Sequence, residues 1–260
     1  MIDSHVHPDH WGIQPILFNI GNLQVPAYSF FVLLGLIVGL VVYAYESKRR
    51  KLLNDDGVFI AFGAILGGVI GAKILEFAIN IDFVLANLSN PVALMSGRTI
   101  VGGLIGGTVG VMIVKKLIGS KERRGNMFAP AIALGVAIGR LGCFFVGCCY
   151  GKATSLPWGV DFGDHILRHP TQIYESIFML GMFIYLERIK NREDVKPGQL
   201  FKTLMLSYFT FRFLIEFIRV EPVIFMGLTV FQIICVGVIV YLARDDINKL
   251  IYKVVKRYVK

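Results

Sequence analysis

The sequence has few charged residues for its length. Asp, Glu, Lys and Arg make up 17% of the 260 residues, whereas apolar residues make up 55% and the mean hydropathy is +0.64. Soluble domains carry about 25% charged residues, so this composition excludes an ordinary soluble domain of this size. The bilayer is the expected solvent, and we predict an integral membrane protein.

Positive charge is absent from the first 47 residues, which contain no Lys and no Arg. A cleavable signal peptide begins with a charged region, so we expect no such peptide and expect the first apolar run to act as the targeting signal. The sequence also lacks a clear repeat, a low-complexity tract and any sign of a second domain. We therefore expect residues 1–260 to form a single membrane-embedded domain.

Seven apolar runs are present and predict membrane helices, since crossing about 30 Å of hydrocarbon takes roughly 20 mostly apolar residues. The runs are 27–46, 58–79, 100–118, 127–148, 172–189, 200–218 and 226–243. The predicted fold is all-α, a polytopic bundle of about seven transmembrane helices.

Basic residues are distributed unevenly between alternate connections. Lys and Arg number four in 48–51, five in 115–124, four in 188–196 and six in 244–260, against one, two and one in the other connections. Cytoplasmic loops carry the basic excess, which predicts an outer N-terminus and a cytoplasmic C-terminus. The net charge of +9 suits an anionic membrane surface, so no nucleic-acid partner is expected. The basic C-terminal tail predicts a helix on that surface.

Ionisable side chains interrupt the apolar runs at Lys73, Glu76, Arg140, Glu175, Arg212 and Glu216. Each costs about 2.5–3.5 kcal/mol at mid-membrane on insertion scales, so we expect them to face the bundle interior. Arg212 and Glu216, four residues apart, predict an ion pair on one helical face. Arg140 and Arg219 lie towards the outer ends of their spans, where a guanidinium can hold a lipid phosphate.

Glycine is dense in 63–71 and 102–110, at spacings that let transmembrane helices pack closely. Gly102 and Gly103 open a span directly after the outward segment "SGRTI", so we expect their amides to be able to meet an anion. Together with the arginines, this predicts an outward-opening basic cavity that binds the headgroup of an anionic phospholipid.

Five stretches, in a shared order, carry a resemblance to a known family. They are "PILFNIGNLQVPAYSFFVLLGLIVGL" (15–40), "IGAKILEF" (70–77), "VGGLIGG" (101–107), "GRLGCFFVGCCYG" (139–151), and "RHPTQIYE" (168–175) with "FRFLIEFIRVEP" (211–222). The chain resembles the prolipoprotein diacylglyceryl transferase family over nearly its whole length. The resemblance implies a multi-pass enzyme of the bacterial plasma membrane. It also implies transfer of a diacylglyceryl group from phosphatidylglycerol to the lipobox cysteine of a prolipoprotein, with no cofactor.

The positions of individual residues in the family motifs imply what those residues do. The resemblance implies that Arg140 and Arg219 are catalytic and hold the phosphate, and that Tyr28 orients the donor. The motifs and the reasoning above predict further substrate-binding residues, which are Lys73, Gly102, Gly103, Cys143, Cys148, His169, Gln172, Tyr174, Glu175 and Glu216.

The chain departs from the family pattern near the expected chemistry. The signature G-R-x-G-N-F-x-N-x-E-x-x-G has Cys143, Val146 and Cys148 in place of its two Asn and its Glu. Val101 stands at the histidine of the family's H-G-G. The usual candidates for deprotonating or orienting an incoming thiol are absent from these positions.

The cysteines leave several interpretations open. Arg140 and Cys143 are three residues apart, so the guanidinium can favour a thiolate, although buried Cys is also a common apolar filler, as expected for Cys235. Cys143 can pair with Cys148 or Cys149, whereas adjacent cysteines form only a strained disulfide. A soft metal ion is a weaker alternative, because C-x4-C-C is not a recognised ligand spacing, and no metal site is predicted.

Two other features remain open. The N-terminal "HVHPDH", with His5, His7 and His10, is interpreted as a polar exposed end, with a weak metal site as the alternative. Two rival functions also remain: a cysteine-dependent membrane carrier of small sulfur compounds, and a non-catalytic homologue that only binds lipid or a partner protein.

Overall fold

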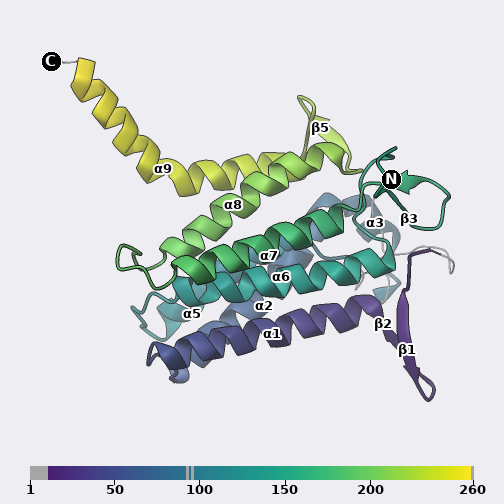
Figure 1. Cartoon of the computed structure of the whole chain (residues 1–260), viewed down its shortest axis with the longest axis horizontal. Coiled ribbons are helices and arrows are strands. Elements are labelled where there is room, and N and C mark those ends of the chain that lie inside the picture. Colours follow the sequence, from purple (N-terminus) through teal and green to yellow (C-terminus); the bar gives the residue numbers. More distant parts are fainter. Residues whose placement is uncertain (1–10, 92–93, 95–96, 259–260) are drawn as a thin grey trace.

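The computed structural model describes residues 11–91, 94 and 97–258 and is mainly helical (Figure 1). Within these residues the long helices are α1 (Ala27–Arg49), α2 (Asp55–Ile79), α5 (Ile100–Leu117), α6 (Gly125–Val146), α7 (Thr171–Ile189), α8 (Gln199–Ile215) and α9 (Val230–Tyr258). Each coincides with a predicted apolar run, and α9 continues through the basic tail. The N-terminal histidines His5, His7 and His10 lie outside the described residues.

Four of the helices in the described part of the chain are long and apolar enough to cross a membrane, namely α1, α2, α5 and α6. A shorter apolar helical segment is Val230–Arg244 of α9. Large apolar side chains such as Leu33, Phe62 and Met112 are exposed on the long helices. Such a surface is suited to contact with lipid. Lipid offers no hydrogen bonds to the backbone, and in a helix the backbone N–H and C=O groups already bond to one another. The chain is therefore organised as a membrane helical bundle.

The fold also contains three short antiparallel hairpins, which the apolar runs do not predict. The described structure is therefore not entirely α-helical and differs in this from the all-α fold predicted from the sequence. The pairs are β1 (Ile16–Ile20) with β2 (Leu23–Pro26), β3 (Val160–Asp161) with β4 (Leu167–Arg168), and β5 (Val223–Phe225) with β6 (Leu228–Thr229). All three lie at one end of the bundle, with the short helix α3 (Ile81–Ala86) (Figure 1). Gly21 and Gly227 make the turns of the first and third hairpins at positive φ.

The connections rich in Lys and Arg meet at the opposite end (Figure 1). There the Lys190 ammonium lies 2.6 Å from the Glu46 carboxylate. The guanidinium of Arg49 donates to the Asn191 side chain at 2.6 Å, and that of Arg124 donates to the Leu52 carbonyl at 2.6 Å. The uneven charge seen in the sequence therefore corresponds to two chemically different ends of the bundle.

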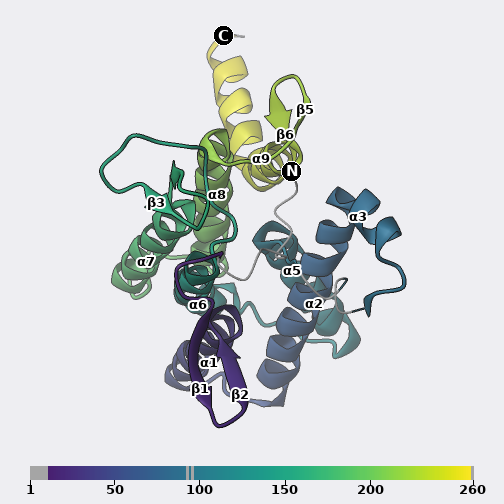
Figure 2. The ribbon, with the colours of Figure 1, turned by 90° about the vertical axis from the view of Figure 1, so that its right-hand side faces the viewer.

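Helices α2 and α5 pack backbone against backbone. A Cβ on Gly71 would lie 2.5 Å from the Gly102 carbonyl oxygen, and one on Gly106 would lie 2.3 Å from that of Gly67. The glycine-dense stretches therefore permit close packing, as predicted. In the view of Figure 2, the α2 and α5 pair stands beside the group that contains α1, α6, α7 and α8.

The main hydrophobic core is formed by α6, α7, α8 and α9, with Val101 of α5. Ala133 of α6, Met179 of α7 and Leu204 of α8 are buried there, and so is Cys235 of α9. The expectation that Cys235 is an apolar filler is confirmed.

We expect Gly106→Ala to destabilise the protein by about 1–3 kcal/mol, because the new methyl group overpacks the α2/α5 contact. Gly181→Ala in α7 is the control, since its Cβ would meet nothing within 4 Å and alanine is the better helix former. Thermal unfolding in detergent, followed by circular dichroism, compares the two. Equal unfolding midpoints would contradict the backbone packing described for α2 and α5.

Candidate active site

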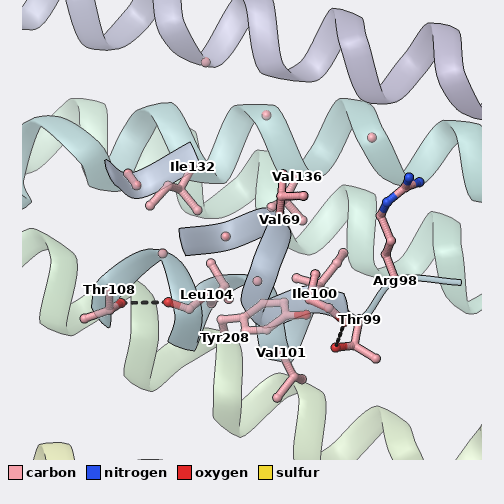
Figure 3. A pocket seen from close by; sticks show the side chains of 18 of the residues that line it. Val69, Arg98, Thr99, Ile100, Val101, Leu104, Thr108, Ile132, Val136 and Tyr208 are labelled. Carbon is pink, nitrogen blue, oxygen red and sulfur yellow. Dashed lines mark hydrogen bonds between the residues drawn. The ribbon is translucent and has the colours of Figure 1, made fainter. Parts of the chain in front are cut away.

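A cavity of about 690 Å³ lies between the α2/α5 pair and helices α1, α6 and α8. Its long walls are apolar: Ile132 and Val136 of α6 point towards Leu104 of α5 (Figure 3). The lining is polar at both ends. At the end nearest the hairpins, which we call the polar end, the side chains are Tyr28, Glu76, Arg98, Arg140, Arg212, Arg219 and Glu221, and at the opposite end they are Lys115, Arg123 and Arg124. An apolar chamber that ends in several guanidinium groups suits an amphipathic molecule with an anionic head.

Arg140 is held by a buried ion pair. Its Nη2 lies 2.6 Å from Glu175 Oε2, and the two residues are only 5% and 1% exposed. The Tyr208 hydroxyl donates to the other carboxylate oxygen of Glu175 at 3.0 Å, so the network joins α6, α7 and α8. The Nη1 of Arg140 faces Cys143 Sγ at 3.8 Å. Its Nε–H is buried and has no acceptor among the described residues.

Arg219 belongs to a second buried network. Arg212 and Glu216 form the ion pair that their spacing predicts, at 2.9 Å, and Arg219 Nε lies 3.7 Å from the same carboxylate. Glu216 belongs to the 3-10 helix η1 (Glu216–Ile218), after which the chain becomes extended at Arg219. The guanidinium of Arg219 also donates to Glu221 at 2.9 Å and to the Cys149 carbonyl at 2.6 Å.

A left-handed turn after α6 gathers three thiols. Gly147 ends the helix at φ 74°, and the Cys148 amide donates back to the Cys143 carbonyl at 3.1 Å. Cys149 follows at φ 63°. The Sγ atoms of Cys143, Cys148 and Cys149 lie within 4.8 Å of one another, and none of the three forms a disulfide. The sequence spacing alone does not reveal this cluster, because it depends on the reversal at Gly147.

Aromatic side chains and an outer loop cover this turn. Trp11 Nε1 donates to the Gly147 carbonyl at 2.8 Å, and the Tyr150 ring stacks on buried Phe162 with centroids 5.7 Å apart. In the loop, a hydrogen bond from the Arg168 guanidinium lowers the pKa of the Asp164 carboxyl below its ordinary value. That ion pair is therefore fully charged at neutral pH.

The predicted site residues divide into two groups. Those that line the cavity are Tyr28, Arg140, Arg219, Gly103 and Cys143. The others lie behind the wall or support it. Gln172 donates to the Cys148 carbonyl at 2.6 Å, and Glu175 and Glu216 hold the two arginines. Cys148 is fully buried beside Cys143.

Three residues predicted to bind substrate make contacts within the protein instead. The Gly102 and Gly103 amides are already used, since they donate to the Thr99 hydroxyl and carbonyl at 3.2 and 3.0 Å and so cannot bind an anion as predicted. Lys73 donates to the Gly97 carbonyl at 3.1 Å and does not line the cavity.

His169 and Tyr174 also stay outside the cavity lining. The His169 ring lies 3.3 Å from the Tyr174 hydroxyl, which accepts from Trp158 Nε1 at 2.8 Å. These side chains hold the outer loop instead of facing the chamber, so their predicted contact with substrate is not supported by their position.

The lining residues that were not among the predicted site residues include Glu76, Arg98, Tyr208 and Glu221. Arg98 stands in "SGRTI" directly before a span, a position that favours an outward-facing cation at the membrane surface. In Figure 3 its side chain extends from the segment before α5. Tyr208 gives no such signal, because an aromatic residue in an apolar run is most often part of the core.

Comparison with known proteins decides the family. The model of the family described as prolipoprotein diacylglyceryl transferase matches residues 15–243. The chain belongs to the prolipoprotein diacylglyceryl transferase family. Relatives named phosphatidylglycerol–prolipoprotein diacylglyceryl transferase include those of Clostridium tetani, Geobacter sulfurreducens and Clostridioides difficile. They are 34%, 33% and 32% identical to this chain, over 81%, 83% and 90% of it and over 87%, 85% and 98% of their own lengths.

Within this prolipoprotein diacylglyceryl transferase fold, three of the positions where the chain departs from the family pattern lie in the cavity wall or directly behind it. Val101 is 1% exposed and contributes an apolar side chain to the cavity wall (Figure 3). Cys143 and Cys148 belong to the thiol cluster beside Arg140. The polar end of the cavity thus combines guanidiniums with thiols, and no histidine lines it within the described chain.

We expect Glu175→Ala to destabilise the protein by about 3–5 kcal/mol, because it leaves the Arg140 charge buried without its partner. Asp194→Ala is the matched control, since Asp194 pairs with Arg192 at 3.2 Å on an exposed surface and such pairs contribute about 0–1 kcal/mol. Both variants are compared by thermal unfolding in the same detergent. Losses of similar size would show that the Arg140–Glu175 pair is not the structural centre described here.

Proposed function

We propose that this protein transfers a diacylglyceryl group from phosphatidylglycerol to the cysteine thiol of a prolipoprotein, the reaction for which its relatives are named. The observation that carries the proposal is the apolar cavity whose polar end is lined by Arg98, Arg140 and Arg219. The acyl chains of the donor would lie along the apolar walls, and its phosphate would meet the guanidiniums.

In this reaction the acceptor sulfur attacks the glycerol carbon of the donor that is bonded to the phosphate oxygen. An S–C bond forms, the C–O bond breaks, and its electron pair leaves with glycerol phosphate. Arg140 and Arg219 stabilise the negative charge that grows on that oxygen, an electrostatic contribution that requires donors already fixed in place. The buried carboxylates of Glu175 and Glu216 fix these donors. Tyr28, on the same lining, would orient the donor.

The proposed setting is the plasma membrane of a bacterium, with the N-terminus outside, the C-terminus in the cytoplasm and all seven long helices crossing. Two observations support this topology. The hairpins lie at the end remote from the basic connections (Figure 1), and Arg219 and Glu221, directly before the third hairpin, line the polar end of the cavity. Lys and Arg are concentrated in alternate connections, as they are in cytoplasmic loops. The donor phosphate and the prolipoprotein would then meet at the outer leaflet.

Mass spectrometry of a synthetic lipobox peptide tests the function. We expect purified protein incubated with phosphatidylglycerol to increase the peptide mass by one diacylglyceryl group, and phosphatidylcholine of the same acyl chains to give no product. An unmodified peptide, under conditions in which a family relative modifies it, would contradict the proposal. Added mass on the protein itself would point to a different acceptor.

We expect Arg140→Ala to lower the rate of peptide modification by at least about 100-fold, the effect typical of removing one preorganised donor. Cys235→Ala should leave the rate near that of the wild type, because Cys235 is buried in the apolar core and does not line the cavity. Rates are compared at equal amounts of folded protein, checked by size-exclusion chromatography. Equal loss in both variants would contradict the assignment of Arg140.

A further inference from the structure

The thiol cluster has the dimensions of a metal site. The Sγ atoms of Cys143, Cys148 and Cys149 lie within 4.8 Å of one another. Three sulfurs at about 2.3 Å from a tetrahedral zinc ion lie about 3.8 Å apart, so a contraction of about 1 Å or less would close the site. Rotation of Cys side chains on a fixed backbone is enough for such a shift.

The backbone that carries two of these thiols is held rigidly. Gln172 Nε2 donates to the Cys148 carbonyl at 2.6 Å. The Thr171 hydroxyl and the Arg219 guanidinium each donate to the Cys149 carbonyl, also at 2.6 Å. The donors come from α7 and from the segment after η1. Outer contacts of this kind orient metal ligands and are a regular part of metal sites.

The charges around the cluster favour an anionic metal–thiolate unit. Three thiolates and one zinc ion carry a net charge of minus one. Arg140 Nη1 lies 3.8 Å from Cys143 Sγ, so its guanidinium can donate a hydrogen bond to that sulfur. Glu175 and Glu221 offset part of the positive charge of Arg140 and Arg219. The site therefore presents three soft ligands, and the Arg140 guanidinium favours the deprotonated form of one of them, Cys143.

We infer that Cys143, Cys148 and Cys149 bind one zinc ion and that its fourth coordination position receives the acceptor thiol. This inference rests on the proposed function. Within the described residues no His, Asp or Glu joins the three thiols as a fourth ligand. Cys143 and Cys149 both line the cavity, beside Arg140 and Arg219, so the open position faces the place assigned to the donor phosphate. Three protein ligands with one open position is the arrangement of catalytic zinc sites.

The zinc ion would activate the acceptor thiol. The carboxylates of Glu76 and Glu221, which line the cavity, each already accept a hydrogen bond, from Asn80 and from Arg219. On coordination the acceptor thiol releases its proton to water, since a metal-bound thiol is deprotonated. Its sulfur then forms the S–C bond while the donor C–O bond breaks, and glycerol phosphate leaves with the electron pair beside Arg140 and Arg219. The neutral thioether product is a weaker ligand and leaves the site.

Metal analysis of the full-length protein, purified with a tag that binds no metal, tests the site directly. We expect about one zinc ion per chain by inductively coupled plasma mass spectrometry, the stoichiometry of a single site with three protein ligands. Zinc should fall at least tenfold in Cys148→Ser and stay unchanged in Cys235→Ser. Copper in place of zinc, or wild-type protein without zinc after incubation with it, would overturn the inference.

A second measurement covers the case in which a cysteine variant folds poorly. Zinc added to chelator-treated wild-type protein should raise its thermal unfolding midpoint, because a ligand that binds only the folded state stabilises it. The same addition should leave the midpoint of Cys149→Ser unchanged. Thiol titration under denaturing, non-reducing conditions should give four thiols per chain. Two thiols would reveal a disulfide within the cluster and overturn the inference.

Peptide modification separates this inference from the proposed function. If both hold, the chelator-treated wild type loses modification and regains it with zinc. Modification at the wild-type rate in zinc-free protein would overturn the zinc site and leave the transferase function standing. A site that binds zinc and the lipobox thiol, seen as a shift in the thiolate absorption of the cobalt-substituted protein, would support the inference even if phosphatidylglycerol gave no product.

Discussion

The buried ion pair between Arg140 and Glu175 is the interaction on which the polar end of the bundle depends. A lone guanidinium at this depth would be costly, and removal of either partner leaves the other charge without compensation. The pair is completed by Tyr208, so that α6, α7 and α8 are joined at one point. Because Glu175 occupies only one side of the guanidinium, its Nη1 faces Cys143. One interaction thus stabilises the fold and orients the guanidinium that we propose to bind the donor phosphate.

Several segments also meet at the turn that follows α6 and carries Cys148 and Cys149. The end of α6, the beginning of α7 and the segment after η1 all meet at the backbone of the thiol-bearing turn. The Cys149 carbonyl accepts hydrogen bonds from both Thr171 and Arg219. Arg219 is therefore bonded to the same turn that begins beside Arg140. The two arginines and the thiols are therefore fixed relative to one another. This preorganisation is what a transfer between a phospholipid and a thiol requires, since donors fixed in advance need not reorganise during the reaction.

Local patterns in the sequence predict the helices well, whereas contacts between distant segments escape them. The apolar runs coincide with the seven long helices, and the Arg212–Glu216 pair follows from a spacing of four residues. The hairpins have strands of two to five residues, too short for a periodic signal. The Arg140–Glu175 pair joins two helices and has no local pattern. The thiol cluster depends on left-handed backbone at Gly147 and Cys149. The sequence did contain a signal against anion binding by the Gly102 amide. Thr99, three residues earlier, is a recognisable helix-capping residue, and its hydroxyl accepts a hydrogen bond from that amide.

The central claim is that guanidiniums at the polar end of the cavity select an anionic phospholipid. Native mass spectrometry of the protein with equimolar phosphatidylglycerol and phosphatidylcholine of identical acyl chains tests it most directly. The account predicts that the wild type retains phosphatidylglycerol in clear preference and that Arg219→Ala, if folded, loses most of that preference. Equal retention of the two lipids by the wild type would contradict the account, because an apolar cavity without a selective anion site would hold both alike.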